Sequence, residues 1–430
     1  MKEYPYWWDT VGSPGPDQRT ETPPPSAVPP RADVAIIGAG YTGLSAARVL
    51  GRAGASVVVL EQHAVGWGAS SRNGGQALTG LKVEPATLVA RHGERHAAQL
   101  FEISKEAGSR LAAMITDESI DCEYERTGHV LAAWKPKHFE AFREEQALLA
   151  RVFNHRVELV DRQSQRSELG SDAYHGLMID EASAGLNPAR YVHGLAAAAE
   201  RAGVTIAPHT AVTRLEPRGP RWRVSTAGGD IDAGDVLVAT DGYSGRAFPP
   251  LQRRLVPIGS YVVVTEPLGE AVAAGILPKR RMAFDSKFFL YYFRLTADRR
   301  LLFGGRAEFG TPTPDTARRA AGILRAGLTT LFPELANVGI THGWGGSVAF
   351  TRDEMPRAGR LDGAFYAGGY CGHGVAMATY LGELVARRMA GEQIEHPLFD
   401  DHFAAIPLYH GKPWFLPLVG AYYAVKDWIQ

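Results

Sequence analysis

The sequence predicts an α/β fold with two domains, and three observations support this prediction. The chain has 430 residues, of which 45% are hydrophobic and 21% charged, so it can build more than one large core. An apolar strand at 34–37 leads through a glycine-rich turn into an alanine-rich helix, and a second strand follows at 56–60. Aromatic and β-branched strands at 260–267, 288–294 and 300–306 predict a separate antiparallel sheet. We therefore expect a parallel sheet covered by helices, beside a domain built on the second sheet.

The composition argues against several classes of partner. Lys plus Arg and Asp plus Glu both number 46, so the chain has no basic excess to neutralise a nucleic acid. The two cysteines, Cys122 and Cys371, form neither a disulfide framework nor a zinc-ligand pattern, which fits a reducing compartment. We expect no nucleic-acid partner, no metal site and a cytoplasmic location.

Both ends of the chain are rich in aromatic residues. Residues 1–30 begin "MKEYPYWWDT" and lack the regions of a secretory signal, so we expect a strap with an aromatic start packed on the folded body and an extended proline-rich remainder. No apolar run reaches the length of about eighteen residues that a membrane-spanning helix needs. The tail at 396–430 ends in an aromatic helix, for which packing against the protein is favoured over membrane contact.

The turn after the first strand carries the pattern G-x-G-x-x-G, in "VAIIGAGYTGLSAA". Gly38 permits the tight turn, Gly40 lets the backbone approach a pyrophosphate, and Gly43 allows the helix to pack closely on the strand. Glu61, at the end of the second strand, can accept both hydroxyls of an adenosine ribose, and its charge disfavours NADP. NAD and FAD both stay open at this point. The expected dinucleotide contacts are Gly38, Gly40, Tyr41, Thr42, Gly43, Glu61 and Gln62.

The segment "GWGASSRNGGQ", at 66–76, places glycines and small polar residues where a fold normally has hydrophobic framework. FAD needs backbone that approaches closely beyond its adenosine half. Ser70, Ser71 and Arg72 can reach phosphate oxygens, and Gly74–Gly75 allow the chain to lie against a flat ring. The loop therefore favours FAD over NAD. Its expected contacts are Gly68, Ala69, Ser70, Ser71, Arg72, Asn73, Gly74, Gly75 and Gln76.

These stretches, together with five others, resemble the FAD-dependent amine and amino-acid oxidoreductases of the glycine/D-amino-acid oxidase type. The five are "HTAVTRLE" (209–216), "VLVATDGYS" (236–244), "YYFRLTADRRLLFGG" (291–305), "TRDEMPRAG" (351–359) and "YAGGYCGHGVAMATYLGELVARRMAG" (366–391). The aromatic strap, "VGWGASSRNGGQ" and the ending "LVGAYYAVKDWI" are similar to the γ-glutamylputrescine oxidase-like members of that family.

The resemblance implies a Rossmann-type FAD-binding domain interleaved with an α+β substrate domain that contains a mixed or antiparallel sheet. The expected FAD-binding segments are 31–90, 185–250 and 335–395. The expected substrate-domain segments are 91–184 and 251–334, with helices at 86–118 and 137–151. N–H groups at the start of the helix after "CGHG" would face the flavin and stabilise its reduced form. Further implied flavin contacts are Val212, Ala239, Thr240, Gly345, Gly372, His373, Gly374, Val375 and Ala376.

Four residues are candidates for a part in the reaction. Alternation along 288–294 puts Leu290, Tyr292 and Arg294 on one face of the strand. The resemblance places Tyr292 over the substrate, while Arg294 and Arg352 are available to bind an acid group. His373 starts a helix, where it either poises the amine or oxygen, or only shapes the pocket.

Four positions depart from the family pattern. Amino-acid-oxidising members hold the substrate carboxylate with an arginine where this chain has Val348, and sarcosine-oxidising members use a lysine where it has Ala376. Members with covalent flavin attach it at positions that here hold Gly346 and Asn73. We therefore expect non-covalent FAD and a substrate whose reacting carbon bears no carboxylate.

The sequence thus predicts an FAD-dependent enzyme that oxidises a primary or secondary amine to an imine, by hydride transfer to flavin N5 followed by hydrolysis. Its partners would be a small-molecule amine and either O2 or another electron acceptor. An amino-acid or N-methylamino-acid oxidoreductase on the same fold is the main alternative, and a non-catalytic FAD-binding protein is another. Cys371 is expected to be a packed core residue, while Trp344 fits either the pocket wall or the core.

Overall fold

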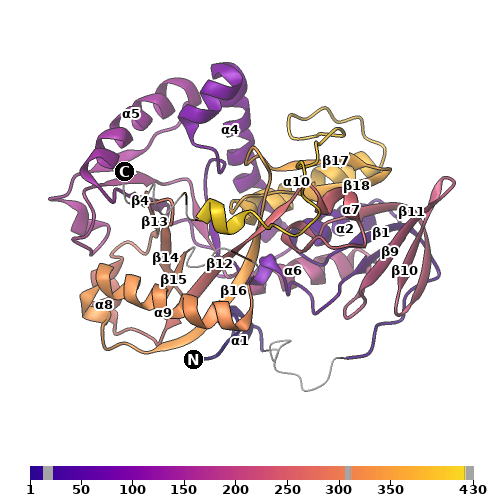
Figure 1. Cartoon of the computed structure of the whole chain (residues 1–430), viewed down its shortest axis with the longest axis horizontal. Helices are drawn as coiled ribbons and strands as arrows, with labels where there is room; N and C mark the ends of the chain where they lie inside the picture. The colour runs from indigo at the N-terminus through magenta and orange to yellow at the C-terminus, as the bar shows by residue number, and fades with distance from the viewer. Residues whose placement is uncertain (13–22, 306–309, 311, 421, 423–430) are drawn as a thin grey trace.

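A computed structural model describes residues 1–12, 23–305, 310, 312–420 and 422, which form two large sheets that lie side by side (Figure 1). The first sheet has the order β17-β18-β11-β1-β2-β8, and β9 and β10 extend it from β11. Its strands are β1 (Arg31–Ile37), β2 (Val57–Leu60), β8 (Thr205–Ala207), β9 (Val212–Arg218), β10 (Arg221–Thr226), β11 (Gly229–Val238), β17 (Arg357–Leu361) and β18 (Ala364–Gly368). β1 pairs in parallel with both β2 and β11, which is the arrangement of a Rossmann-type sheet.

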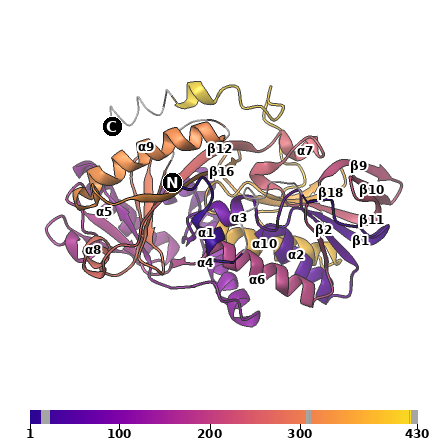
Figure 2. The same ribbon diagram turned by 90° about the horizontal axis from the view of Figure 1, so that it is seen from below.

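Three helices cover one face of this sheet: α2 (Tyr41–Arg52), α6 (Pro188–Arg201) and α10 (Gly374–Met389) (Figure 2). Small residues let them approach closely. A Cβ at Gly382 of α10 would lie 2.5 Å from the carbonyl oxygen of Thr42 in α2. Ser45 of α2 donates a hydrogen bond to the carbonyl of Thr379. The alanine- and glycine-rich sequence of α2 is therefore needed because a second helix lies against it.

The second sheet has the order β16-β12-β15-β14-β13-β4-β6-β5. Its strands are β4 (His129–Ala132), β5 (Glu158–Val160), β6 (Leu177–Asp180), β12 (Val256–Thr265), β13 (Met282–Asp285), β14 (Tyr291–Leu295), β15 (Leu301–Gly305) and β16 (Ile340–Phe350). The pairs are antiparallel except for β4 with β13, so the sheet is mixed. The α/β fold with a second, mixed sheet is confirmed.

The position of β16 corrects one predicted boundary. The sequence assigned 335–395 to the FAD-binding domain, but β16 pairs with β12 along nearly its whole length and belongs to the second sheet. The chain returns to the first sheet only at β17. Alternating apolar residues and glycines in β16 do not indicate which sheet it joins, because strand pairing is decided by a partner about eighty residues earlier in the chain.

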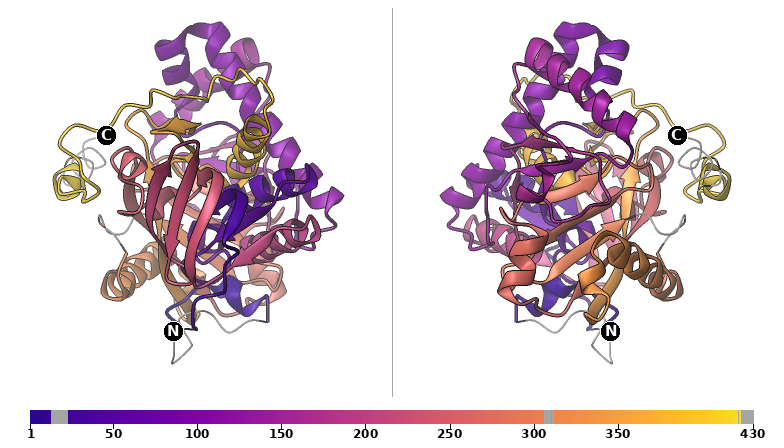
Figure 3. Two further views of the ribbon diagram at one scale, coloured as in Figure 1. Left: turned by 90° about the vertical axis from the view of Figure 1, so that its right-hand side faces the viewer. Right: turned by 90° about the vertical axis from the view of Figure 1, so that its left-hand side faces the viewer.

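Helices cover both faces of the second sheet. α9 (Pro314–Leu331) and α8 (Glu270–Ile276) pack on one face, with Phe293 and Phe303 fully buried beneath them. α5 (Pro136–Phe153) packs on the far end of the other face, and α4 (Pro85–Asp117) packs against α5 and α10 (Figure 3). α4 bends at Gly93, whose φ of 73° and ψ of 160° are not helical. The shorter elements are α1 (Tyr6–Asp9), α3 (Ala69–Arg72), α7 (Pro249–Gln252), β3 (Gln76–Ala77), β7 (Ala184–Gly185), η2 (Gln165–Ser167), η3 (Asp241–Tyr243) and η4 (Pro333–Leu335).

The aromatic N-terminus lies between the two sheets. Trp7 and Trp8 of α1 are buried in one cluster with Trp344 of β16. The indole of Trp8 donates to Ser71 Oγ at 2.7 Å, and that of Trp7 donates to the carbonyl of Asn73 at 2.9 Å. Residues 13–22 of the predicted extended strap lie outside the described residues. The N-terminal aromatic residues therefore support the glycine-rich loop from behind.

The C-terminal segment runs along the surface of the body (Figure 2, Figure 3). Leu416 is buried against Val256 and Tyr409, whereas Trp414 and Leu418 are 62% and 70% exposed. The segment thus packs on the protein with one side and presents apolar side chains on the other. Residues 421 and 423–430 of the predicted helix lie outside the described residues.

Candidate active site

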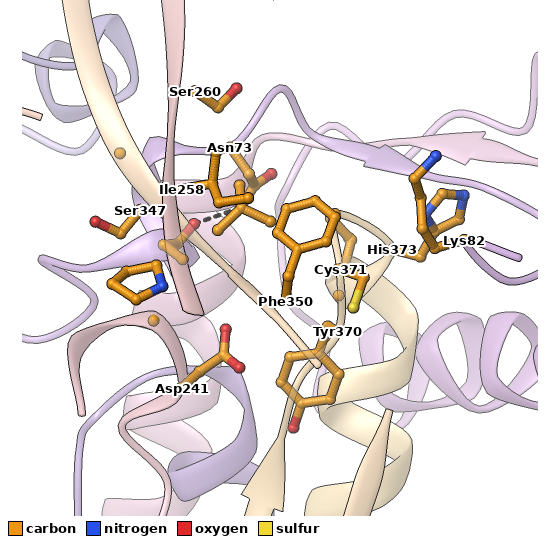
Figure 4. A pocket seen from close by; sticks show the side chains of 18 of the residues that line it. Asn73, Lys82, Asp241, Ile258, Ser260, Ser347, Phe350, Tyr370, Cys371 and His373 are labelled. Atoms are coloured by element: carbon orange, nitrogen blue, oxygen red, sulfur yellow. Dashed lines mark hydrogen bonds between the residues drawn. The ribbon is translucent and has the colours of Figure 1, made fainter. Parts of the chain in front are cut away.

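A cavity of about 2420 Å³ lies between the two sheets. Its walls come from the dinucleotide motif, the glycine-rich loop, the inner face of the second sheet and the start of α10. Figure 4 shows Asn73, Ile258 and Ser260 on one side, and Cys371 and His373 on another. Segments far apart in the sequence therefore meet here.

The dinucleotide motif has the geometry that a bound diphosphate requires. Gly38 has a φ of +106°, and a Cβ there would lie 2.7 Å from the carbonyl oxygen of Ala239. A Cβ on Gly43 would lie only 2.0 Å from the carbonyl oxygen of Gly38, so Gly43 packs α2 on β1 and does not line the cavity. Gly40 and Thr42 do line it, at a helix start where backbone N–H groups have no partner within the helix. These residues fit the pyrophosphate of a dinucleotide.

Glu61 is held in place by the backbone around it. Its carboxylate accepts from the N–H of Ala39 at 3.0 Å and from that of His63 at 2.9 Å, and burial raises its pKa. A carboxylate has about four acceptor positions, so these two bonds do not exhaust its capacity to accept from a ribose hydroxyl. Val212 and Thr240 line the same part of the cavity, as do the predicted contacts Gln62, Ala239 and Gly68.

The glycine-rich loop corrects two predicted contacts, Ser71 and Gly75, and shows a supporting role for a third residue, Arg72. Ser71 is buried away from the cavity, and its hydroxyl donates to the carbonyl of Gly66. The Arg72 guanidinium lies over the rings of Trp8 and Trp67, 4.9 and 4.4 Å from their centroids, and donates to the carbonyls of Trp67 and Gly345, although Arg72 does line the cavity. Stacking and these bonds make it a support of the loop, and its remaining N–H donors leave the predicted contact with FAD a prediction.

Gly75 is the second correction, because it does not line the cavity. Its φ is +70°, and a Cβ would lie 2.1 Å from the carbonyl oxygen of Leu186. Its neighbour Gly74 does line the cavity, and a Cβ there would lie 2.9 Å from the ring of Tyr292. Because they have no side chain, the two glycines allow other protein segments to approach closely, as well as a flat ring. The remaining predicted contacts of the loop, Ala69, Ser70, Asn73 and Gln76, line the cavity, and their contact with FAD stays a prediction.

Tyr292 and Arg294 lie on the same face of β14, but their side chains have different surroundings. The Tyr292 hydroxyl shares a 3.3 Å hydrogen bond with Ser260 Oγ in the cavity, and burial raises its pKa. Arg294 does not line the cavity; its Nη1 donates to the carbonyls of Gly75 and Leu186 at 2.7 and 3.0 Å, and burial lowers its pKa to about 10. The prediction that Arg294 meets substrate is wrong, because the glycine-rich loop takes its donors. Arg352 lines the cavity and is exposed.

The start of α10 places a neutral histidine at the cavity. Burial, with the Lys82 ammonium adding to it, lowers the pKa of His373 to about 3. The buried Nδ1 has no hydrogen-bond partner among the described residues. Gly372, Gly374 and Val375 line the cavity, but Ala376 is turned away from it and corrects a predicted contact. Figure 4 shows Lys82 next to His373.

Two core residues beside the site settle earlier alternatives. Cys371 is 2% exposed, its thiol donates to the carbonyl of Gly369, and burial raises its pKa to about 12, so it is a packed residue. Trp344 lines the cavity and also packs in the cluster of Trp7 and Trp8. Its indole donates to the carbonyl of Arg72, so both interpretations of Trp344 hold.

Sequence reasoning missed Asp241. This carboxylate lines the cavity, accepts from the N–H of Gly369 at 2.7 Å, and has a pKa raised by burial to about 6. Its φ of 39° is unusual for a residue other than glycine. The one available signal was its position directly after Thr240. Its burial arises from β18, more than a hundred residues later, so the sequence around it does not reveal it.

Comparisons with known proteins agree with this geometry. The family described as "DAO: FAD dependent oxidoreductase" matches residues 33–388. The chain belongs to this family. It is therefore an FAD-dependent oxidoreductase of a family that acts on amines and amino acids, and FAD is its cofactor.

Individual relatives of this DAO family member cover most of the chain. It is 35% identical to the γ-glutamylputrescine oxidoreductase of Escherichia coli, over 92% of both chains. It is 34% identical to a probable oxidoreductase OrdL of Rhizobium meliloti, over 98% of this chain and 99% of that one. The solved glycine oxidase of Geobacillus kaustophilus superimposes with a TM-score of 0.76 at 19% identity, covering 89% of this chain and all of that one.

The described part of the chain has neither a membrane-spanning helix nor a metal-binding cluster. None of its helices is both long enough and apolar enough to cross a membrane. Within the same residues, no three His, Cys, Asp or Glu side chains are grouped so that they could hold a metal ion.

We expect the replacement His373→Asn to make the protein less sensitive to acid. The folded-state pKa lies below the ordinary value of 6.5, so as pH falls from 6.5 towards about 3 the unfolded chain binds the proton first and folding stability is lost. Asparagine cannot take that proton. The thermal midpoint with saturating FAD, followed from about pH 7 to about pH 4.5, should fall less steeply in the variant. Parallel curves would show that His373 is not a buried neutral imidazole.

Proposed function

We propose that this enzyme oxidises the C–N bond of a primary or secondary amine of the γ-glutamylputrescine type to an imine, which water then hydrolyses. One observation carries the proposal. The two positions at which amino-acid-oxidising relatives place a cation for the substrate carboxylate hold Val348, which lines the cavity, and Ala376, which does not. A carboxylate on the reacting carbon would therefore lose its bidentate partner.

The residues present have definite tasks in such a reaction. FAD, when bound, supplies the acceptor for a hydride from the carbon next to the nitrogen. The Tyr292 ring and the glycine-rich loop confine the amine, while the Tyr292 and Ser260 hydroxyls offer hydrogen bonds to it. Aromatic and aliphatic walls disfavour the charged ammonium, so the neutral amine that must react is favoured. His373, also neutral, adds no positive charge to oppose this.

We also propose that FAD is bound without a covalent link. Gly346 has no side chain, and the amide of Asn73 donates to the carbonyl of Ala69 at 2.9 Å. Neither residue offers a nucleophile. The same proposal includes an electron acceptor, which is either O2 or another compound. The rate at which air reoxidises the reduced flavin distinguishes the two.

A second candidate function is the oxidation of an amino acid or N-methylamino acid, and Arg352 favours it. Its side chain lines the cavity and is exposed. No ion pair joins it to a described residue, so its guanidinium is available to a substrate carboxylate in a different pose.

An anaerobic titration of the yellow protein separates the two. We expect γ-glutamylputrescine, and putrescine more weakly, to bleach the flavin absorbance, while sarcosine, glycine and D-alanine leave it unchanged. Bleaching by the amino acids alone would overturn the proposal and favour the second candidate. Acid precipitation of the same sample should leave the yellow colour in the supernatant; a yellow pellet would contradict non-covalent binding.

A further inference from the structure

The floor of the cavity is an apolar row across four strands of the second sheet. Tyr292 pairs with Phe284, Phe284 with Leu131, and Leu131 with Met178, so the four side chains project from the same face in register. All four line the cavity. Three strand spacings of about 4.8 Å make the row about 14 Å long. β14, β13 and β4 can be followed side by side in Figure 1.

The near end of this row is the proposed reaction site, because Tyr292 lies against Gly74 of the glycine-rich loop. Its far end lies under α5. Phe142 of α5 packs in one cluster with Met178 and Leu131. A substrate chain lying on the floor would therefore run from the loop towards α5.

A carboxylate stands at that far end. Glu145 lies one helical turn after Phe142 and before Leu149, and all three line the cavity. Glu145 is half-buried, and none of the described residues gives it a hydrogen bond or an ion pair. Burial, with the exposed Glu84 carboxylate adding to it, raises its pKa to about 7. A partly buried carboxylate of this kind is stabilised by an incoming cation.

The nearby basic residues do not fill that role. Arg91 donates to the carbonyl of Asp353, and no ion pair joins it to Glu145. Lys82 lies beside His373 (Figure 4), and no ion pair joins it to Glu145. The Glu145 carboxylate therefore has no cationic partner among the described residues, and a positively charged group of a ligand can take that place.

We propose that Glu145 binds a second ammonium group of the substrate and thereby selects amines that carry one at the far end of a long chain. This inference rests on the proposed function. Bonds of about 1.5 Å at angles near 111° advance an extended chain by ~1.25 Å each, so the floor accommodates roughly ten bonds between the reacting carbon and the second nitrogen. The α-ammonium of a γ-glutamyl amide of a four-carbon diamine meets this spacing, whereas putrescine itself is too short.

The test compares two ligands that differ in one group. γ-Glutamylputrescine carries the α-ammonium, and glutarylputrescine is the same amide without it. Calorimetry on the holoenzyme with its flavin reduced beforehand measures binding with no turnover. We expect the wild type to bind the first compound ten- to a hundredfold more tightly, and Glu145→Gln to reduce this ratio to near one.

The neighbouring variant Glu144→Gln is the matched control, since Glu144 is exposed and does not line the cavity. It should keep the wild-type ratio, and both variants should keep the wild-type unfolding midpoint within a few degrees. Equal affinities for the two compounds in the wild type, or an unchanged ratio in E145Q, would overturn the inference. Failure of the oxidised flavin to bleach would instead count against the proposed reaction, and leaves the binding ratio as an independent readout.

Discussion

Gly43→Ala is expected to produce a colourless protein of much reduced stability. The added Cβ would stand 2.0 Å from the carbonyl oxygen of Gly38 and 3.2 Å from Cγ2 of Ile36. The first of these is a backbone atom of the turn that holds the pyrophosphate, so α2 must move away from β1. Overpacking of this kind costs about 3 kcal/mol or more. The N–H groups at the start of the displaced helix would also no longer point towards the phosphates. The ratio of flavin to protein absorbance and the urea midpoint both report the effect.

The matched control for this experiment is Gly322→Ala in α9. A Cβ at Gly322 has no heavy atom within 4 Å, so the change should be neutral or stabilise the helix by about 0.5–1 kcal/mol. Full flavin content in G43A would contradict the close contact between α2 and the turn.

Arg294→Met should loosen the glycine-rich loop and lower FAD affinity at least tenfold. The guanidinium links the carbonyls of Gly75 and Leu186, which methionine cannot do. The Leu186 carbonyl would be left without a donor, while the Gly75 carbonyl would keep the N–H of Leu186. A buried carbonyl without its donor costs about 1–3 kcal/mol, so we expect the free energy of unfolding to fall by about that amount. Equilibrium dialysis against FAD and chemical denaturation measure the two effects.

Arg299→Met, on the same hairpin but exposed, is the control and should change neither quantity. Arg294→Lys should give an intermediate result, because an ammonium keeps the charge but lacks the planar fork. Should R294M instead retain FAD and stability yet fail to oxidise substrates that carry a carboxylate, the original assignment of Arg294 to substrate binding would be restored.

The dinucleotide motif shows how much of the site the sequence predicts. Gly38, Gly40 and Glu61 lie where their spacing places them, because a tight strand–turn–helix unit is determined by neighbours in the chain. Alternation likewise separated Tyr292, in the cavity, from Phe293, in the core. The FAD cofactor and the family follow from the same local patterns.

Ser71, Arg72 and Arg294 show where that reasoning stops. Their residue types suit a phosphate or a carboxylate, yet each of them bonds to a distant protein group: Ser71 to Trp8, Arg72 to the carbonyl of Gly345, and Arg294 to that of Leu186. Those partners lie between about sixty and 270 residues away along the chain. A polar side chain takes whichever partner the packing offers, and only the assembled fold shows which one that is.

By itself, then, the sequence determined the α/β class, the FAD cofactor, the glycine-rich strand–turn–helix unit and the position of Tyr292 at the cavity, because each rests on contacts within that unit or on alternation along one strand. Tertiary structure alone decided that β16 joins the second sheet, that Asp241 is half-buried at the cavity, and that Glu145 stands at the end of the apolar floor. These features depend on strand pairing and helix packing between distant segments. A local sequence pattern does not predict the free energy of such contacts.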